Sequence, residues 1–232
     1  MVLRRAHNAR NVSRVFATRK EMGMRRLAAV VLILSSAGCA SMKNTPDVGD
    51  SSAAIGAETL WKPGYAWGYR YETPRDSGTF AWIMDREETL DGTTFYVVRS
   101  GPKDIYVRKS DFAYYMEKMN GEIVGRNVPP ARFVAAVAGE KWEVNYVRET
   151  PKEHRTENIA TTCESSGPEK ITVQAGTFET LKTTCTNSRT GELAYEIWYA
   201  VATRQMVRDR TFFSDGRRDR ELIDISLNPR VQ

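Results

Sequence analysis

The sequence predicts an all-β domain, folded as a curved antiparallel sheet of the half-barrel or meander type. Two observations support this prediction. Large apolar residues recur at every second position in several segments, which is typical of strands with one buried face, and turn-forming residues separate those segments, as in hairpins. The turn signals are Asp91-Gly92, Ser100-Gly101-Pro102, Asn120-Gly121, Ser166-Gly167-Pro168, Thr190-Gly191 and Asp215-Gly216.

The first expected strand covers residues 65–71, where Tyr65, Trp67, Tyr69 and Tyr71 alternate with smaller or charged residues. The same period recurs further along the chain. Its other apolar sets are Phe80, Trp82 and Met84; Trp142, Val144 and Tyr146; Leu193, Tyr195, Ile197 and Tyr199; and Ile223, Ile225 and Leu227. Each set predicts a strand that turns one face toward a core.

Two segments are ambiguous at this level. Residues 111–119 could form a helix capped by Asp111, yet the same residues alternate acceptably as a strand, and their β-rich surroundings favour the strand. Residues 129–139, with an alanine-rich centre, are expected to be a short helical turn or a connecting loop.

A weak internal repeat runs through the domain. The pattern Gly-x-x-Trp-x-Tyr-x-Tyr at residues 64–71 recurs 75 residues later as Gly-x-x-Trp-x-Val-x-Tyr, and residues 92–95 are loosely echoed by residues 176–178. Duplication would divide residues 60–232 into two β-meander units, 60–135 and 136–232. Coincidence in a sequence rich in aromatic residues and turns explains the pattern equally well.

The N-terminal region is typical of an export signal. An apolar run at residues 27–38 follows Arg25 and Arg26. As a helix it would reach only ~18 Å, short of the roughly 30 Å of a bilayer core, so a signal segment fits better than a membrane anchor. The run ends in Ser36-Ala37-Gly38-Cys39, which resembles the lipobox of bacterial lipoproteins, although that family usually has Leu where Ser36 stands. An ordinary secretory signal cleaved near Ala40 is the alternative.

The lipobox resemblance implies an anchor and a location. In that family the cysteine thiol receives a diacylglycerol, the signal is cut before the cysteine, and the freed amine is acylated; the corresponding residue is Cys39. Ala40 follows it instead of the aspartate that retains lipoproteins in the inner membrane, so the resemblance implies an outer-membrane protein that faces the periplasm. The implied partner is the membrane, through the covalent lipid.

This processing would define the domains and the charge. Residues 1–38 would be removed, with Met24 as the expected true start, residues 39–59 would be a lipidated flexible tether, and residues 60–232 a single β-rich domain. Residues 1–38 carry 8 of the 34 Lys and Arg and 1 of the 29 acids, so the remaining chain has a net charge of −2 instead of +5. We therefore expect no nucleic-acid partner.

Two cysteines remain once Cys39 is assigned to lipid. Cys163 and Cys185 would lie in a compartment that permits disulfides. A hairpin that turns at residues 174–176 and carries a bulge at residues 166–168 could bring them together. We expect a structural disulfide, because the sequence has no C-x-x-C redox motif.

A second resemblance lies in the C-terminal part. Residues 171–178, I-T-V-Q-A-G-T-F, and residues 196–200, E-I-W-Y-A, look like the V-P-A-G-T-F turn and W-Y-A strand of uncharacterised bacterial envelope proteins, with Gln174 in place of proline. Gly176 would permit the tight turn, and Phe178 would begin the next buried face. Those proteins resemble, more distantly, the half-barrel fold of periplasmic lipoprotein carriers, whose concave sheet shelters acyl chains, so an apolar ligand is what this fold analogy implies.

We expect no catalytic residues, no metal site and no cofactor. The sequence lacks the H-E-x-x-H, G-x-S-x-G, phosphate-loop and zinc-type spacings. The single histidine of the mature chain, His154, falls in a polar run typical of a surface loop. Neighbouring acids such as Glu87 and Glu88 would point to opposite faces of a strand. A catalytic pair of carboxylates would therefore have to come from distant strands, which the sequence leaves open.

The candidate binding feature is aromatic. Six residues could line an apolar cleft of the curved sheet: Trp67, Tyr69, Tyr71, Trp82, Trp142 and Tyr146. Core packing is the competing interpretation, because large aromatic residues at period two usually fill a core. The expected function is a lipid-anchored, non-catalytic binding module for an apolar ligand or another envelope protein. A structural or assembly-support lipoprotein without a pocket is the alternative, and an enzyme is less favoured.

Overall fold

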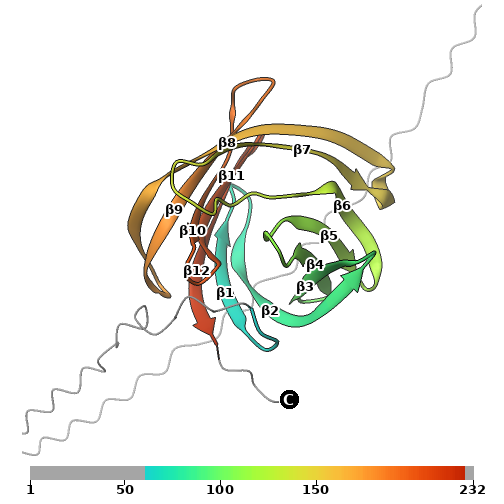
Figure 1. Cartoon of the computed structure of the whole chain (residues 1–232), viewed down its shortest axis with the longest axis horizontal. Coiled ribbons are helices and arrows are strands. Elements are labelled where there is room, and N and C mark those ends of the chain that lie inside the picture. Colours follow the sequence, from blue (N-terminus) through green and yellow to red (C-terminus); the bar gives the residue numbers. More distant parts are fainter. Residues whose placement is uncertain (1–60, 228–232) are drawn as a thin grey trace, which may run out of the picture. The chain divides into compact units, whose positions relative to one another are not determined.

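Every strand in residues 61–227 pairs with its neighbours along the chain, and β1 also pairs with β12, so the sheet closes into a barrel (Figure 1). The computed structural model describes these residues. The strands are β1 (Ala66–Glu72), β2 (Ser77–Leu90), β3 (Thr93–Ser100), β4 (Lys103–Arg108), β5 (Tyr114–Met119), β6 (Glu122–Ala131), β7 (Lys141–Thr150), β8 (Arg155–Val173), β9 (Gly176–Asn187), β10 (Leu193–Ala200), β11 (Gln205–Phe213) and β12 (Gly216–Ser226), with a 3-10 turn, η2, at Pro151–Glu153. Within residues 61–227, no helix has the length and apolar character needed to cross a membrane.

The prediction of an all-β antiparallel sheet is confirmed, and the structure adds the closure that a half-barrel lacks. The closing pair runs antiparallel from Ala66 opposite Ser226 to Glu72 opposite Asp219. An open meander would expose unpaired backbone groups on its first and last strands, and closure pairs those groups with each other.

The connections define two ends of the barrel. Because successive strands alternate in direction, the hairpins β1–β2, β3–β4, β5–β6, β7–β8, β9–β10 and β11–β12 share one end, which we call the hairpin end. The described segment begins at Trp61 and finishes at Leu227. Both of these residues belong to the opposite end, which we call the terminal end.

A core of aromatic and aliphatic side chains fills the barrel toward its terminal end. Trp61 and Trp67 are 7% and 2% exposed, and their ring centres lie 4.9 Å apart. The Trp61 indole N–H donates to the Arg204 carbonyl at 3.2 Å, and the Tyr69 hydroxyl donates to the Met206 carbonyl at 3.0 Å. The polar atoms of Trp61 and Tyr69 are therefore satisfied by backbone carbonyls just before and within the start of β11.

A bulge shifts the alternation in β12. The pairing with β1 skips Ile223, so Leu222 is the fully buried residue and Ile223 is only half-buried. The predicted apolar set is therefore wrong in its first member, while Ile225 and Leu227 pack against the core as expected. An inserted residue reverses the faces on one side of it, and a period-two pattern does not reveal where that happens.

The two ambiguous segments form a strand and a loop. β5 is the strand expected within residues 111–119, and it follows a turn in which Phe112 adopts a φ of 58°. Arg108 holds this turn by donating to both carboxylate oxygens of Asp111, at 2.8 and 2.6 Å. The loop expected at residues 129–139 is confirmed only from residue 132, because residues 129–131 end β6; residues 132–140 form the loop.

The predicted disulfide between Cys163 and Cys185 is confirmed. The two residues face each other across β8 and β9, and both are fully buried. The expected bulge is also present, because the register of β8 against β9 shifts between Ser165 and Pro168. The turn at Gly176, with a φ of 138°, and the burial of Phe178 in the core match the expectation for that hairpin.

Removing the disulfide should destabilise the barrel. The double variant Cys163→Ala, Cys185→Ala frees a loop with a sequence separation of 22 residues, which the chain-entropy model values at about 3 kcal/mol of unfolding free energy. Urea unfolding of the oxidised protein and of the double variant measures this difference. Coincident unfolding midpoints with equal slopes would contradict the prediction.

Candidate functional site

The barrel encloses a cavity of about 710 Å³. Eight strands make a barrel that side chains just fill, and twelve strands make a wider one, so interior space follows from the strand number. The volume falls within the range of small-molecule sites, roughly 300–1,000 Å³. The apolar lining includes Trp61, Phe80, Trp82, Ile105, Val107, Phe112, Phe133, Tyr146, Ile159, Ile197 and Tyr199.

The loop between β6 and β7 supplies part of the wall. These two strands pair only through Arg126, Asn127 and Val128 of β6. Phe133 from the following loop lines the cavity, with its ring edge-on to those of Tyr146 and Tyr195 at 5.9 and 5.4 Å. A loop residue thus extends the apolar surface beyond the strands.

Charged side chains occupy the half of the cavity nearer the hairpin end. Glu117 of β5 lies 2.6 Å from the Lys103 ammonium of β4 and 3.4 Å from the Arg148 guanidinium of β7. Arg148 also donates to the side-chain oxygen of Asn127 at 2.9 Å. Gly125 leaves room for this guanidinium, because a Cβ at that position would lie 2.5 Å from an Arg148 nitrogen.

A second charged group comes from β11 and β12. Asp209 has a side chain only 3% exposed and pairs with Arg220 at 2.6 Å. Arg218 lies 3.9 Å from the other Asp209 oxygen and donates to the Thr211 hydroxyl at 3.1 Å. The Arg220 guanidinium is also 5.6 Å from the centre of the Trp82 ring, so the charged group borders the apolar wall directly.

The ionisation of the β5 group follows from its surroundings. Burial, and then the adjacent Glu117, hold the pKa of Tyr114 well above its ordinary value, against the opposing charges of Arg148 and Arg220. Burial also acts to raise the pKa of Glu117, but hydrogen bonds from Lys103 and Tyr114 and the nearby cations outweigh it and lower that pKa. Glu117 is therefore ionised at neutral pH, and Tyr114 remains a neutral hydrogen-bond donor.

The cavity carries an excess of positive charge. Its ionisable lining comprises five cations and two carboxylates: Lys103, Arg148, Arg204, Arg218, Arg220, Glu117 and Asp209. Both carboxylates are already ion-paired. Among the residues that line the cavity, three positive charges are left without a carboxylate to balance them.

The structure divides the six predicted ligand-face residues among three places. Three of them line the cavity: Tyr71, Trp82 and Tyr146. Trp67 and Tyr69 lie in the terminal-end core, 2% and 0% exposed. Trp142 packs against the disulfide cluster, and its indole N–H donates to the Arg132 carbonyl at 3.2 Å. The predicted lipid attachment residue, Cys39, lies outside the described residues.

Sequence reasoning missed the charged half of the cavity. Arg218 and Arg220 stand in a run of mixed charges, which is typical of a solvated strand. The alternation that buries Leu222 places both arginines on the same inner face and Arg217 on the outer one. Applying the period-two alternation to the charged as well as the apolar positions of that strand could have placed both arginines inside the barrel.

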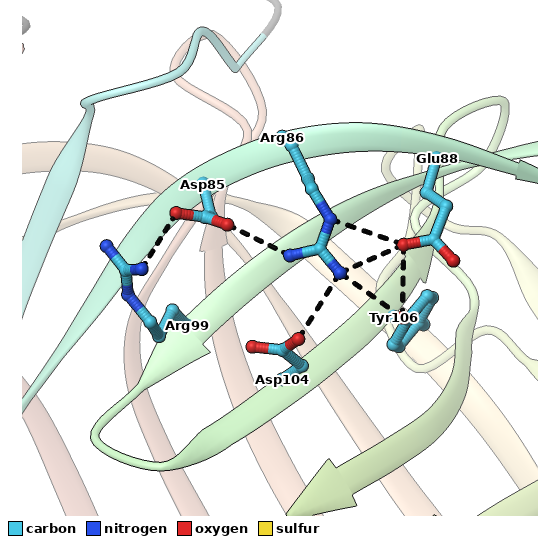
Figure 2. A network of polar contacts seen from close by, with 6 residues as sticks. All are labelled: Asp85, Arg86, Glu88, Arg99, Asp104 and Tyr106. Carbon is cyan, nitrogen blue, oxygen red and sulfur yellow. Dashed lines mark hydrogen bonds and ion pairs between the residues drawn. The ribbon is translucent and has the colours of Figure 1, made fainter. Parts of the chain in front are cut away.

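A second polar cluster lies on the outer face of β2, β3 and β4 (Figure 2). Arg86 contacts Asp85, Glu88 and Asp104 at 2.9, 2.9 and 3.3 Å, and Asp85 also pairs with Arg99 at 3.1 Å. Partial burial acts to lower the pKa of Arg86, but its hydrogen bonds to the three carboxylates raise it overall. Every carboxylate here is paired with an arginine, so the cluster links three strands through ion pairs and leaves none of its carboxylates without a cation.

The described residues hold no group of side chains that suggests a metal site. No group of three or more His, Cys, Asp or Glu in this part of the chain could hold a metal ion. His154 is exposed beside η2, as expected for a surface loop. The lowered pKa of Glu117 is opposite to what a general acid requires. The cavity is suited to holding a molecule with apolar and anionic parts.

Comparisons with known proteins add little. No family model matches the chain, and no curated protein matches it. Three similar solved structures are a protein inferred to be exported, with a YmcC-like fold, from Bacteroides fragilis (12% identity, TM-score 0.42, 71% of this chain and 96% of that one); an inferred lipoprotein from Parabacteroides distasonis (13%, 0.36, 71% and 96%); and the hypothetical lipoprotein YmcC from Escherichia coli (12%, 0.39, 79% and 92%). Similarity at this level assigns no function.

Replacing Glu117 by Gln should destabilise the protein in a pH-dependent way. At neutral pH the variant leaves Lys103 and Arg148 without their carboxylate, at a cost of about 2 kcal/mol. Because the folded-state pKa of Glu117 lies below its ordinary value of 4.5, its contribution is fully present above that pH and is lost as the pH falls through the folded-state value. The Tm difference between wild type and Glu117→Gln should therefore shrink in acid. A difference that stays constant down to the acid limit of folding would contradict this.

Proposed function

We propose that the protein is a lipid-anchored binding protein of the bacterial envelope that holds an apolar ligand inside its barrel without changing it chemically. The observation that carries the proposal is the cavity of about 710 Å³ with its aromatic and aliphatic lining. A core built only for stability would pack these side chains against one another and leave few voids larger than a water molecule. Transferring an apolar ligand from water onto the apolar part of a lining of this extent is favourable.

The competing role of a structural lipoprotein without a pocket depends on a surface that recruits another protein. An exposed sheet edge is the surface that would do so by strand addition. Among the strands of residues 61–227, each has a paired neighbour on both sides, so no whole strand is left as an edge; an unpaired stretch remains at residues 141–146 of β7, because β6 pairs with that strand through three residues only. The closed sheet therefore favours the interior as the working surface.

Location in the envelope is supported by two independent features of the chain. The lipobox-like sequence ending at Cys39 predicts export and lipid attachment. The disulfide between Cys163 and Cys185 fits an oxidising compartment such as the periplasm. The tether would join the barrel at Trp61, which belongs to the terminal end, opposite the charged hairpin end.

Filling the cavity should abolish binding without unfolding the protein. Ile159 lines the cavity, whereas its neighbour Asn158 in β8 is exposed on the other face. We expect the neutral fluorophore N-phenyl-1-naphthylamine to bind the mature chain without its lipidated Cys39, residues 40–232, and Ile159→Trp to weaken binding about tenfold. Asn158→Trp is the matched control and should bind as the wild type does.

Fluorescence titration measures the dissociation constants, and circular dichroism checks that both variants fold. If the wild type gives no saturable fluorescence increase, or if Asn158→Trp and Ile159→Trp behave alike, the proposed binding function is wrong.

The anchor has its own test. Cells grown with radiolabelled palmitate should label the wild-type protein, and Cys39→Ala should lose the label because no thiol remains to accept the lipid. The Cys163→Ala, Cys185→Ala variant is the control, since it removes two other thiols and should keep the label. Labelling of Cys39→Ala would contradict the lipoprotein assignment.

A further inference from the structure

Building on the proposed function, we propose that the ligand is an amphiphile with an anionic head group, and that the charged half of the cavity binds this head group with Arg218 as its main contact. The ligand chemistry is a carboxylate or phosphate monoester that carries a long alkyl chain. The proposal rests on three features: the charge balance inside the barrel, the unsatisfied donor of Arg218, and the direction in which the apolar wall continues.

The first feature is the uncompensated charge. Lys103 and Arg148 share Glu117, and Arg218 and Arg220 share Asp209. Four cations thus meet two carboxylates within the hairpin-end half. Holding cations together in a partly desolvated space costs free energy unless an anion accompanies them, and a bound carboxylate or phosphate would supply that anion.

The second feature is the geometry of Arg218. One terminal nitrogen donates to Thr211 and lies 3.9 Å from Asp209. Its Nε–H is buried and has no hydrogen-bond partner among residues 61–227. Burial and the neighbouring Arg220 lower the pKa of Arg218, against the opposing charges of Asp209 and Glu117. A planar anion that accepts from Nε would satisfy this donor, and guanidinium groups bind carboxylates and phosphates in that way.

The third feature is the polarity gradient along the barrel. Cavity-lining positions of β11 extend from Thr211, in the charged half, to Gln205 at the terminal end. At the rise of a β-strand this separation is about 20 Å along the chain, long enough for an extended acyl chain. Two cations of the charged half, Lys103 and Arg218, are both 34% exposed, whereas Trp61 at the other end is 7% exposed. The head group would therefore stay close to water while the chain enters the apolar part.

The test compares four probes that differ only in head group or chain: dodecanoate, monododecyl phosphate, dodecan-1-ol and inorganic phosphate. Each competes with N-phenyl-1-naphthylamine for the mature chain, residues 40–232, below the critical micelle concentration of the probes. We expect the two anionic amphiphiles to bind the wild type about tenfold more tightly than the alcohol, because charge-assisted hydrogen bonds exceed neutral ones. We also expect inorganic phosphate alone to compete far more weakly.

The matched variants are Arg218→Gln and Arg217→Gln, neighbours in β12 that lie inside and outside the barrel. Arg218→Gln should remove most of the preference for the anionic probes while dodecan-1-ol binds as before, and Arg217→Gln should keep the preference. The comparison of the four probes on the wild-type protein needs no variant, so it tests the preference for an anionic head group even if Arg218→Gln does not fold.

Each outcome has a separate meaning. If dodecan-1-ol competes as well as dodecanoate, or if Arg218→Gln keeps the preference, the head-group site is wrong and the apolar binding function stands. If inorganic phosphate competes as well as monododecyl phosphate, the site is for a free anion and the amphiphile is wrong. If the fluorophore itself does not bind, the proposed function fails and the head-group site fails with it.

Discussion

The pairing of β1 with β12 is the interaction on which the rest of the structure depends. It converts a twelve-strand meander into a barrel whose circumference is fixed by strand number, and that circumference is too large for side chains alone to fill. It also sets β12 beside β1, one strand away from β2, and Arg220 of β12 lies 5.6 Å from the centre of the Trp82 ring of β2. Without this seam the arginines of β12 would stand on an exposed edge, and the cavity would have no second wall.

The free-energy cost of burying charge then determines which parts of the interior can hold charged side chains. Asp209, the most buried carboxylate of the cavity at 3% exposure, is held by Arg220, at 18%. Among the arginines, those with more distant carboxylates are more exposed: Arg148, 3.4 Å from Glu117, is 29% exposed, and Arg218, 3.9 Å from Asp209, is 34% exposed. This order follows the cost of desolvation, since charges without a close partner remain where water still reaches them. The same order leaves the charge excess at the hairpin end, where an incoming anion would replace water.

The sequence predicted local features well and their depth in the barrel poorly. Alternation located β1, β2, β7, β10 and β12, and the hairpin expected around residues 174–176 predicted the disulfide between Cys163 and Cys185, because these features depend on neighbours along the chain. Trp67 and Tyr146 share the same inward alternation, yet Trp67 is core and Tyr146 is cavity wall. The two residues differ in their position along the barrel axis and in the width of the barrel at that position. Both are set by closure and by the bulge opposite β1, neither of which leaves a periodic signal in the sequence.

The two copies of the weak repeat occupy corresponding places in the order of strands, although duplication itself stays a prediction. Residues 64–71 lead into β1 and residues 139–146 into β7, and Gly64 and Gly139 both adopt a positive φ, of 92° and 75°. The echo at residues 92–95 and 176–178 falls at β3 and β9, the third strand of each six-strand half. Neither half holds a complete site, however. The first half contributes Lys103 and Glu117, and the second contributes the three cavity arginines of β7 and β12 together with Asp209. An ancestral half could have supplied the strand pattern, but the charged cavity exists only where the two halves close on each other.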